Sequence, residues 1–151
     1  MKHLTSAIGM VLLTLFAVTG YTQNKQAPKP ALFADFPTTI HCTQAQLSSF
    51  FTAAKGENIS ISFAGNFTLS GPVTSNLEKY SNLHTIVIQL PAFKNTLFSL
   101  SKQTDEAGKI MYVGRILNPL YADGFELKNN ADGDYELVKT DLEKIVVSCN
   151  L

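Results

Sequence analysis

The sequence is poor in the residues on which several protein functions depend. Among its 151 residues there is no tryptophan, and there are two cysteines, three histidines and a single arginine, Arg115. Lysine plus arginine and aspartate plus glutamate are equal in number, at 12 each. Binding to a nucleic-acid backbone or to an anionic membrane surface needs an excess of basic side chains. The composition therefore argues against both kinds of partner.

The sequence also gives little support for a metal or cofactor site. Beyond residue 20 the histidines are His41 and His84, and neither has a second His or Cys at the spacing of a zinc site. Residues 130–134 lack the alternating acids and the closing glutamate of a calcium loop. The chain also has no glycine-rich phosphate loop and no Gly-x-Ser-x-Gly motif. We expect no metal and no cofactor.

Catalytic groups are also lacking. The acids between residues 123 and 136 lie at predicted turns and on the polar side of predicted strands, with no neighbour that would separate their pKa values for acid–base catalysis. Cys42 follows His41, but adjacent residues of an extended chain point apart, so His41 is poorly placed to activate the thiol. We predict that the protein is not an enzyme, and we assign no catalytic residue.

One apolar run has the length of a signal-peptide core, and it lies at the start of the chain. Lys2 precedes residues 7–18 (AIGMVLLTLFAV), and Gly20 follows them, which is the pattern of a secretory signal peptide. The run is shorter than the about 20 residues that a membrane-spanning helix needs. We expect residues 1–20 to be cleaved and the protein to be exported, to the periplasm or the cell exterior, with no membrane span. The lysine-rich, arginine-poor composition favours a bacterial source.

The two cysteines, Cys42 and Cys149, stand near the two ends of the predicted domain. In an exported protein an even number of cysteines favours a disulfide. Closing a loop of this length would stabilise the fold by about 4–5 kcal/mol in the chain-entropy model. A reactive Cys42 is the alternative, and it would require both thiols to stay free in an oxidising compartment. We predict the disulfide.

The domain is expected to begin after a linker. Residues 21–36 contain Gln, Asn, Lys and two prolines with little periodicity, which is typical of a solvated linker, and residues 37–151 then form one globular domain. Thr43 and Gln46 form a capping box, and Gly56 predicts the end of the helix that follows. The apolar residues at helical spacing within this helix are Leu47, Phe50, Phe51 and Ala54.

From residue 59 onward, apolar and polar residues alternate as in strands with one buried face. Short connectors with turn residues separate these segments, beginning with Gly65-Asn66. The predicted strands are 59–63, 67–70, 73–80, 83–90, 96–102, 110–117, 125–128 and 135–140. We predict an α+β fold in which the N-terminal amphipathic helix packs on an antiparallel meander or partial barrel of about seven strands. Residues 140–147 fit either a helical turn or a last strand.

A binding or structural module is the function class that these exclusions leave. We expect a monomeric, non-enzymatic module that contacts a protein or cell-envelope partner through a sheet face or through loop tips. The candidate partner-binding residues lie in and beside the loop at 118–124 and are Tyr121, Asp123 and Phe125. A secreted enzyme inhibitor that uses the same loop is one alternative.

The other alternative is a pocket for an apolar small molecule between the helix and the curved sheet. Arg115 would then stand at the mouth and clamp a ligand carboxylate, although pairing with Glu126 across the sheet is the more common role of such an arginine. The remaining candidate ligand-binding residues are Tyr112, His84 and Phe98. An open cavity beneath them would favour this alternative, and a filled core would count against it.

Overall fold

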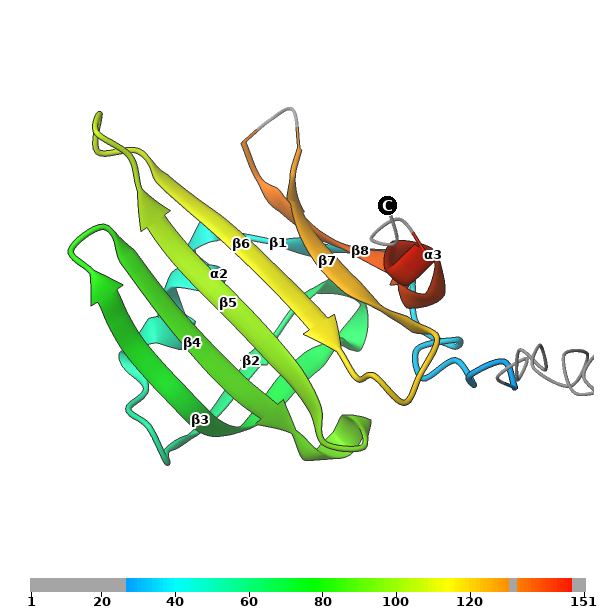
Figure 1. The fold of residues 1–151 in the computed structure, drawn as a ribbon. Coiled ribbons are helices and arrows are strands. Elements are labelled where there is room, and N and C mark those ends of the chain that lie inside the picture. Colours follow the sequence, from blue (N-terminus) through cyan, green and yellow to red (C-terminus); the bar gives the residue numbers. More distant parts are fainter. Residues whose placement is uncertain (1–26, 131–132, 148–151) are drawn as a thin grey trace, which may run out of the picture.

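The computed structural model describes residues 27–130 and 133–147. In this part of the chain eight strands form one antiparallel sheet in the order β1-β8-β7-β6-β5-β4-β3-β2, which curves into a half-barrel (Figure 1). The strands are β1 (Thr39–Cys42), β2 (Asn58–Ser62), β3 (Thr68–Tyr80), β4 (Leu83–Leu90), β5 (Thr96–Thr104), β6 (Ile110–Leu117), β7 (Asp123–Asn129) and β8 (Tyr135–Asp141). The helices are α2 (Gln44–Ser49) and α3 (Leu142–Val147), with 3-10 turns η2 (Phe50–Thr52), η3 (Ala64–Asn66) and η4 (Pro91–Phe93).

The antiparallel meander predicted from the alternation is confirmed, and the sheet has eight strands, because two of the predicted segments form the single strand β3 and one further strand is added. The unpredicted strand is β1, which pairs with β8 through Ile40↔Leu137 and Cys42↔Tyr135. Only two of its four residues point inward, too few for the alternation to stand out in the sequence. The predicted signal peptide and Cys149 lie outside the described residues.

Strand β3 turns a corner in the sheet. Its first part, from Thr68 to Pro72, pairs with β2, and its second part, from Val73 onward, pairs with β4. The two strands predicted on either side of Gly71 are therefore one bent strand. A side chain at Gly71 would place its Cβ 1.9 Å from the carbonyl oxygen of Gln89, so only glycine permits this close approach of the two strands.

The small helix α2 carries the capping box expected from the sequence. The Thr43 hydroxyl accepts a hydrogen bond from the backbone N–H of Gln46, and the Gln46 side chain accepts one from the backbone N–H of Thr43. The α-helix is shorter than predicted, because it tightens into η2 after Ser49 and does not continue to Gly56. The tighter winding changes the buried positions, so Ala53 is buried while Ala54 is exposed.

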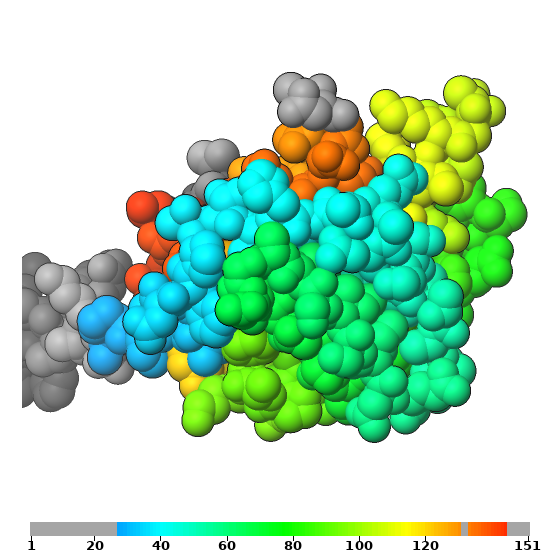
Figure 2. All heavy atoms as spheres, turned by 180° about the vertical axis from the view of Figure 1, so that it is seen from behind, coloured from blue at the N-terminus to red at the C-terminus, as the bar shows by residue number. Residues whose placement is uncertain are grey.

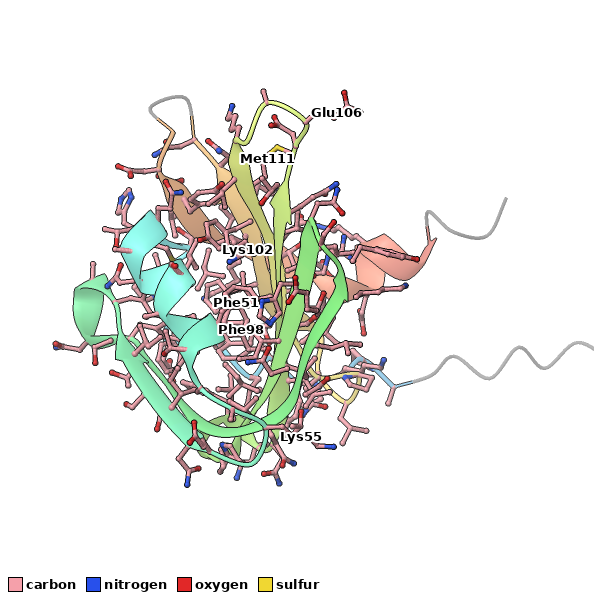
Figure 3. The ribbon with its side chains drawn as sticks, turned by 90° about the vertical axis from the view of Figure 1, so that its left-hand side faces the viewer. Phe51, Lys55, Phe98, Lys102, Glu106 and Met111 are labelled. Carbon is pink, nitrogen blue, oxygen red and sulfur yellow. The ribbon has the colours of Figure 1, made fainter. Side chains whose placement is uncertain are left out.

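The interior of the half-barrel is filled by phenylalanine side chains. Phe33 and Phe125 meet edge to face with ring centroids 5.1 Å apart, and Phe50 and Phe98 do the same at 5.1 Å. Figure 3 shows Phe98 and Phe51 among the side chains packed between α2 and the sheet. Seen from behind, the blue-to-green segments from the N-terminal stretch to β3 lie over this interior (Figure 2).

Residues 142–147 form the helix α3, which settles the choice that the sequence leaves open. Asp141 caps it by accepting the backbone N–H of Glu143 at 3.0 Å. Desolvation raises the pKa of Asp141, but this hydrogen bond and the ammonium of Lys144 hold the pKa below its usual value. None of the helices in the described segments has the length and apolar character needed to cross a bilayer.

Candidate functional site

The four residues predicted to bind a ligand do not share one site. Tyr112, Phe98 and His84 lie on the inner face of the sheet, and Tyr112 and Phe98 are buried. Arg115 projects from the opposite, outer face of β6, with 56% of its side chain exposed, and pairs with Glu126 at 3.2 Å. The pairing of Arg115 with Glu126 across the sheet is confirmed, and an arginine at the mouth of an inner cavity is not observed.

The inner face around these residues is occupied by the protein itself. The Phe51 ring lies 4.9 Å from the His84 ring between centroids, and the Lys102 ammonium stands over Phe51 at 5.5 Å. The backbone N–H of Tyr112 donates to the Tyr135 hydroxyl at 3.1 Å. The aromatic and aliphatic side chains around them on the inner face include buried core residues, namely Phe63, Phe67, Ile86, Ile88, Phe98 and Tyr112.

Two of the three predicted partner-binding residues are also buried. Phe125 is part of the core. The Asp123 carboxylate accepts the backbone N–H groups of Leu32 at 2.6 Å and Phe33 at 3.0 Å, which ties the segment before the first strand to the start of β7. Tyr121 is half-buried and does reach a surface hollow.

A different surface stands out, the outer side of the half-barrel from β3 to β6. The strand registers place one set of alternating side chains together on this side. From here on, the outer face denotes the residues of this set up to the register shift in β3 at Glu78–Tyr80, namely Ser75, Leu77, Thr85, Val87, Gln89, Leu97, Ser99, Ser101, Gln103, Met111, Val113, Arg115 and Leu117. Arg115 is its single charged member, and Glu126 on the neighbouring strand compensates that charge. Figure 1 looks onto this face.

Large apolar side chains are exposed on the outer face and beside it. Leu97 and Leu117 face each other across β5 and β6, and they are 43% and 36% exposed. Val113 is 60% exposed, and Leu120, in the loop that follows β6, is 72% exposed. These four residues are called the apolar strip, which the Arg115–Ser99 pair interrupts between Val113 and Leu117.

The loop that presents Leu120 is fixed from inside. Asn118 is buried, and its amide nitrogen donates to the Lys94 carbonyl at 3.2 Å, while its amide oxygen accepts the backbone N–H of Leu120 at 3.1 Å. The backbone N–H of Ala122 then donates to the Pro30 carbonyl at 2.9 Å. The exposed leucine therefore stands on a preorganised turn.

A hollow of about 510 Å³ adjoins this loop. It lies where the end of β6, the start of β7, α3 and the segment before β1 meet at one end of the molecule (Figure 1). The hollow is lined by residues that include Lys29, Arg115, Leu117, Tyr121, Glu126 and Leu142. The structure thus brings Arg115 and Tyr121 together at a site that the sequence did not predict.

Neither a metal site nor a reactive thiol is evident in the described segments. No three His, Cys, Asp or Glu side chains gather there in a way that could hold a metal ion. Cys42 is buried, and burial raises the pKa of its thiol to about 12. A thiol with this pKa is a poor nucleophile near neutral pH. No protein-family model, no curated protein and no solved structure was found to match the chain significantly.

One feature of the sequence indicates the low charge of the outer face. Along β5 and β6, the residues that alternate with the buried ones are Leu, Ser, Ser and Gln, then Met, Val, Arg and Leu. Solvent-facing strand positions usually carry more charge. Without the registers, however, the sequence does not show that these positions lie side by side.

Proposed function

We propose that the protein is an exported, non-enzymatic module that binds another protein through the outer face and Leu120. One observation carries the proposal: among the outer-face residues, which come from four strands, Arg115 is the single charged side chain. The surface of a small domain is roughly a quarter to a third charged residues, whereas the centres of protein interfaces are depleted of charge.

The apolar strip strengthens this interpretation. Leu97 and Leu117 face each other at one end of the outer face, Val113 lies beyond Arg115 on β6, and Leu120 projects from a turn whose backbone is already ordered. An exposed anchor on a rigid turn loses little conformational freedom on binding. The interior, by contrast, is filled with aromatic side chains, which favours binding on the outside of the half-barrel.

The composition of the outer face also defines the partner surface. A partner that placed charged groups against Val113 or Leu97 would bury them without a counter-charge, which is costly. The complementary surface is therefore a protein surface with an apolar centre and hydroxyl or amide side chains around it. Charged contacts are expected only at the border, where Glu126 and Lys128 stand beside Arg115.

The test compares variants of the mature protein as bait for envelope and culture-medium proteins of its source. Val113→Lys and Leu120→Asp each place a charge within the strip, and Ala54→Lys places one at an exposed position on the other side of the molecule. We expect a protein retained by the wild type and by Ala54→Lys whose affinity falls at least about thirtyfold for Val113→Lys and Leu120→Asp.

The same variants define the contrary outcomes. Retention of the same proteins by all four baits would exclude the outer face as the docking surface, and so would the absence of any specific ligand of the wild type. Sedimentation velocity completes the comparison. A dimer that Val113→Lys dissociates would show that the face binds a second copy of the chain instead of a different protein.

A further inference from the structure

The hollow beside the 118–122 loop has the form of a ligand site, and it adjoins the outer face at Arg115 and Leu117. Its volume of about 510 Å³ falls within the range of small-molecule pockets, about 300–1,000 Å³. Its walls come from parts of the chain far apart in sequence, since both Lys29 and Leu142 of α3 line it. The hollow therefore exists only in the folded protein.

Apolar groups make up much of its wall. Leu117, Pro119, Tyr121 and Leu142 all contribute to it. Such a wall favours a ligand with an aliphatic or aromatic body, because burying apolar ligand surface against it releases water from both.

The two acids that line the hollow, Glu126 and Glu143, already make contacts within the protein. Glu126 already contacts the guanidinium Nη2 of Arg115 at 3.2 Å and the ammonium of Lys128 at 3.9 Å. The Glu143 carboxylate accepts the backbone N–H of Lys29 at 3.3 Å. Both acids thus have partners.

The two cations retain unused donors. Among the described residues, no oxygen contacts the remaining guanidinium nitrogens of Arg115 or the ammonium of Lys29. An arginine side chain has five N–H donors in a planar fork, and a lysine ammonium has three. The vacant donors at the hollow therefore complement an anion, and a planar carboxylate matches the guanidinium fork.

We propose that this hollow binds an apolar small molecule that carries one carboxylate, such as a medium-chain alkyl carboxylate. Arg115 and Lys29 hold the carboxylate, and the alkyl chain lies against Leu117, Tyr121 and Leu142. The proposal does not depend on the docking surface, although Arg115 and Leu117 border both. No bond is made or broken at the site.

The first experiment uses three probes of equal chain length: octanoate, octan-1-ol and octylammonium. Each is titrated into the isotopically labelled mature protein while its amide resonances are followed by NMR. We expect octanoate to shift the amides of Leu117, Tyr121 and Leu142 and to bind at least about tenfold more tightly than octan-1-ol. Octylammonium is expected to bind no better than the alcohol.

Variants then assign the charge recognition to residues. Arg115→Gln and Lys29→Gln should each weaken octanoate binding at least about tenfold while leaving octan-1-ol binding unchanged. Lys128→Gln is the matched control, because Lys128 also contacts Glu126 but does not line the hollow. Lys29→Gln breaks no side-chain contact within the described residues, so it remains informative if Arg115→Gln is unstable.

Three results would overturn the proposal. They are the absence of amide shifts at millimolar octanoate, equal affinity for octanoate and octan-1-ol, and octanoate binding that neither Arg115→Gln nor Lys29→Gln weakens. Val113→Lys separates this proposal from the proposed function, because it should weaken protein binding at least about thirtyfold while octanoate still binds.

Discussion

At the scale of single residues, Asp123 connects two parts of the chain that lie 90 residues apart. Its carboxylate accepts two backbone N–H groups, from Leu32 and Phe33, and so holds the Phe33 ring against Phe125 in the core. The sequence alone suggests a surface role for Asp123, because it stands in a loop rich in turn residues. Its actual partners come from a stretch that the composition assigns to a linker.

Asp123→Asn tests this role. An asparagine of the same shape keeps one acceptor oxygen and loses the charge, so we expect the free energy of unfolding to fall by about 1.5–3 kcal/mol. The measurement is chemical denaturation followed by circular dichroism, with the exposed Asp35→Asn as control. Limited proteolysis should then cut more readily before residue 36 in Asp123→Asn. Equal stability of the two variants would contradict the role assigned to Asp123.

At the scale of elements, β3 decides how the sheet closes. Because its two halves pair with different strands, the sheet bends where Gly71 and Pro72 stand. Alternation predicted strand character on both sides of this point. It did not predict one continuous strand, because a Gly-Pro pair in a sequence is usually a sign of a turn.

Gly71→Ala tests the corner. The added Cβ would lie 1.9 Å from the Gln89 carbonyl oxygen and 2.9 Å from the Pro91 ring, so β3 and β4 must separate. We expect a loss of about 1–3 kcal/mol or more in the free energy of unfolding, measured as a lower denaturation midpoint. Ser70→Ala, at an exposed neighbouring position, is the control. An unchanged midpoint for Gly71→Ala would show that the corner has room to relax.

In helix α2, local sequence features predict where the helix begins but not where it ends. Thr43 and Gln46 are close in sequence, so the capping box and the start of the helix follow from local chemistry alone. Where the helix ends depends on packing, because Phe50 reaches the Phe98 ring in the core and the chain must then turn toward β2. The glycine at position 56 marks a later turn, with its N–H bonded to the Val73 carbonyl.

At the scale of the whole molecule, alkylation of the cysteines tests whether a disulfide joins the two ends of the domain. Cys42 is buried on β1, and the predicted partner Cys149 lies outside the described residues. We expect no alkylation by iodoacetamide of the unreduced protein at pH 8, folded or unfolded, and two alkylated thiols after reduction, as measured by intact mass. Two modified thiols on the unfolded, unreduced protein would exclude the disulfide.

The reduced protein provides a pH prediction. Desolvation by burial, with a smaller contribution from the Glu136 charge, raises the pKa of the Cys42 thiol from 9.0 to about 12 and outweighs the hydrogen bond from the Leu137 backbone. The folded state therefore holds this proton more tightly than the unfolded state. The stability of the reduced protein should be constant below about pH 9 and decline between pH 9 and 12. Cys42→Ser should lack this decline in pH-dependent denaturation.

The sequence by itself determined the antiparallel strands and the helix start at Thr43. These depend on alternation and on contacts three residues apart. For Arg115 the sequence left two roles open, ligand binding and pairing with Glu126. Only the tertiary structure decided that the interior is filled, that Asp123 is buried, and that Arg115 meets Lys29 and Leu142 at a hollow. Charge depletion of the outer face also required the registers, because residues of four strands become one surface only when the sheet sets them side by side.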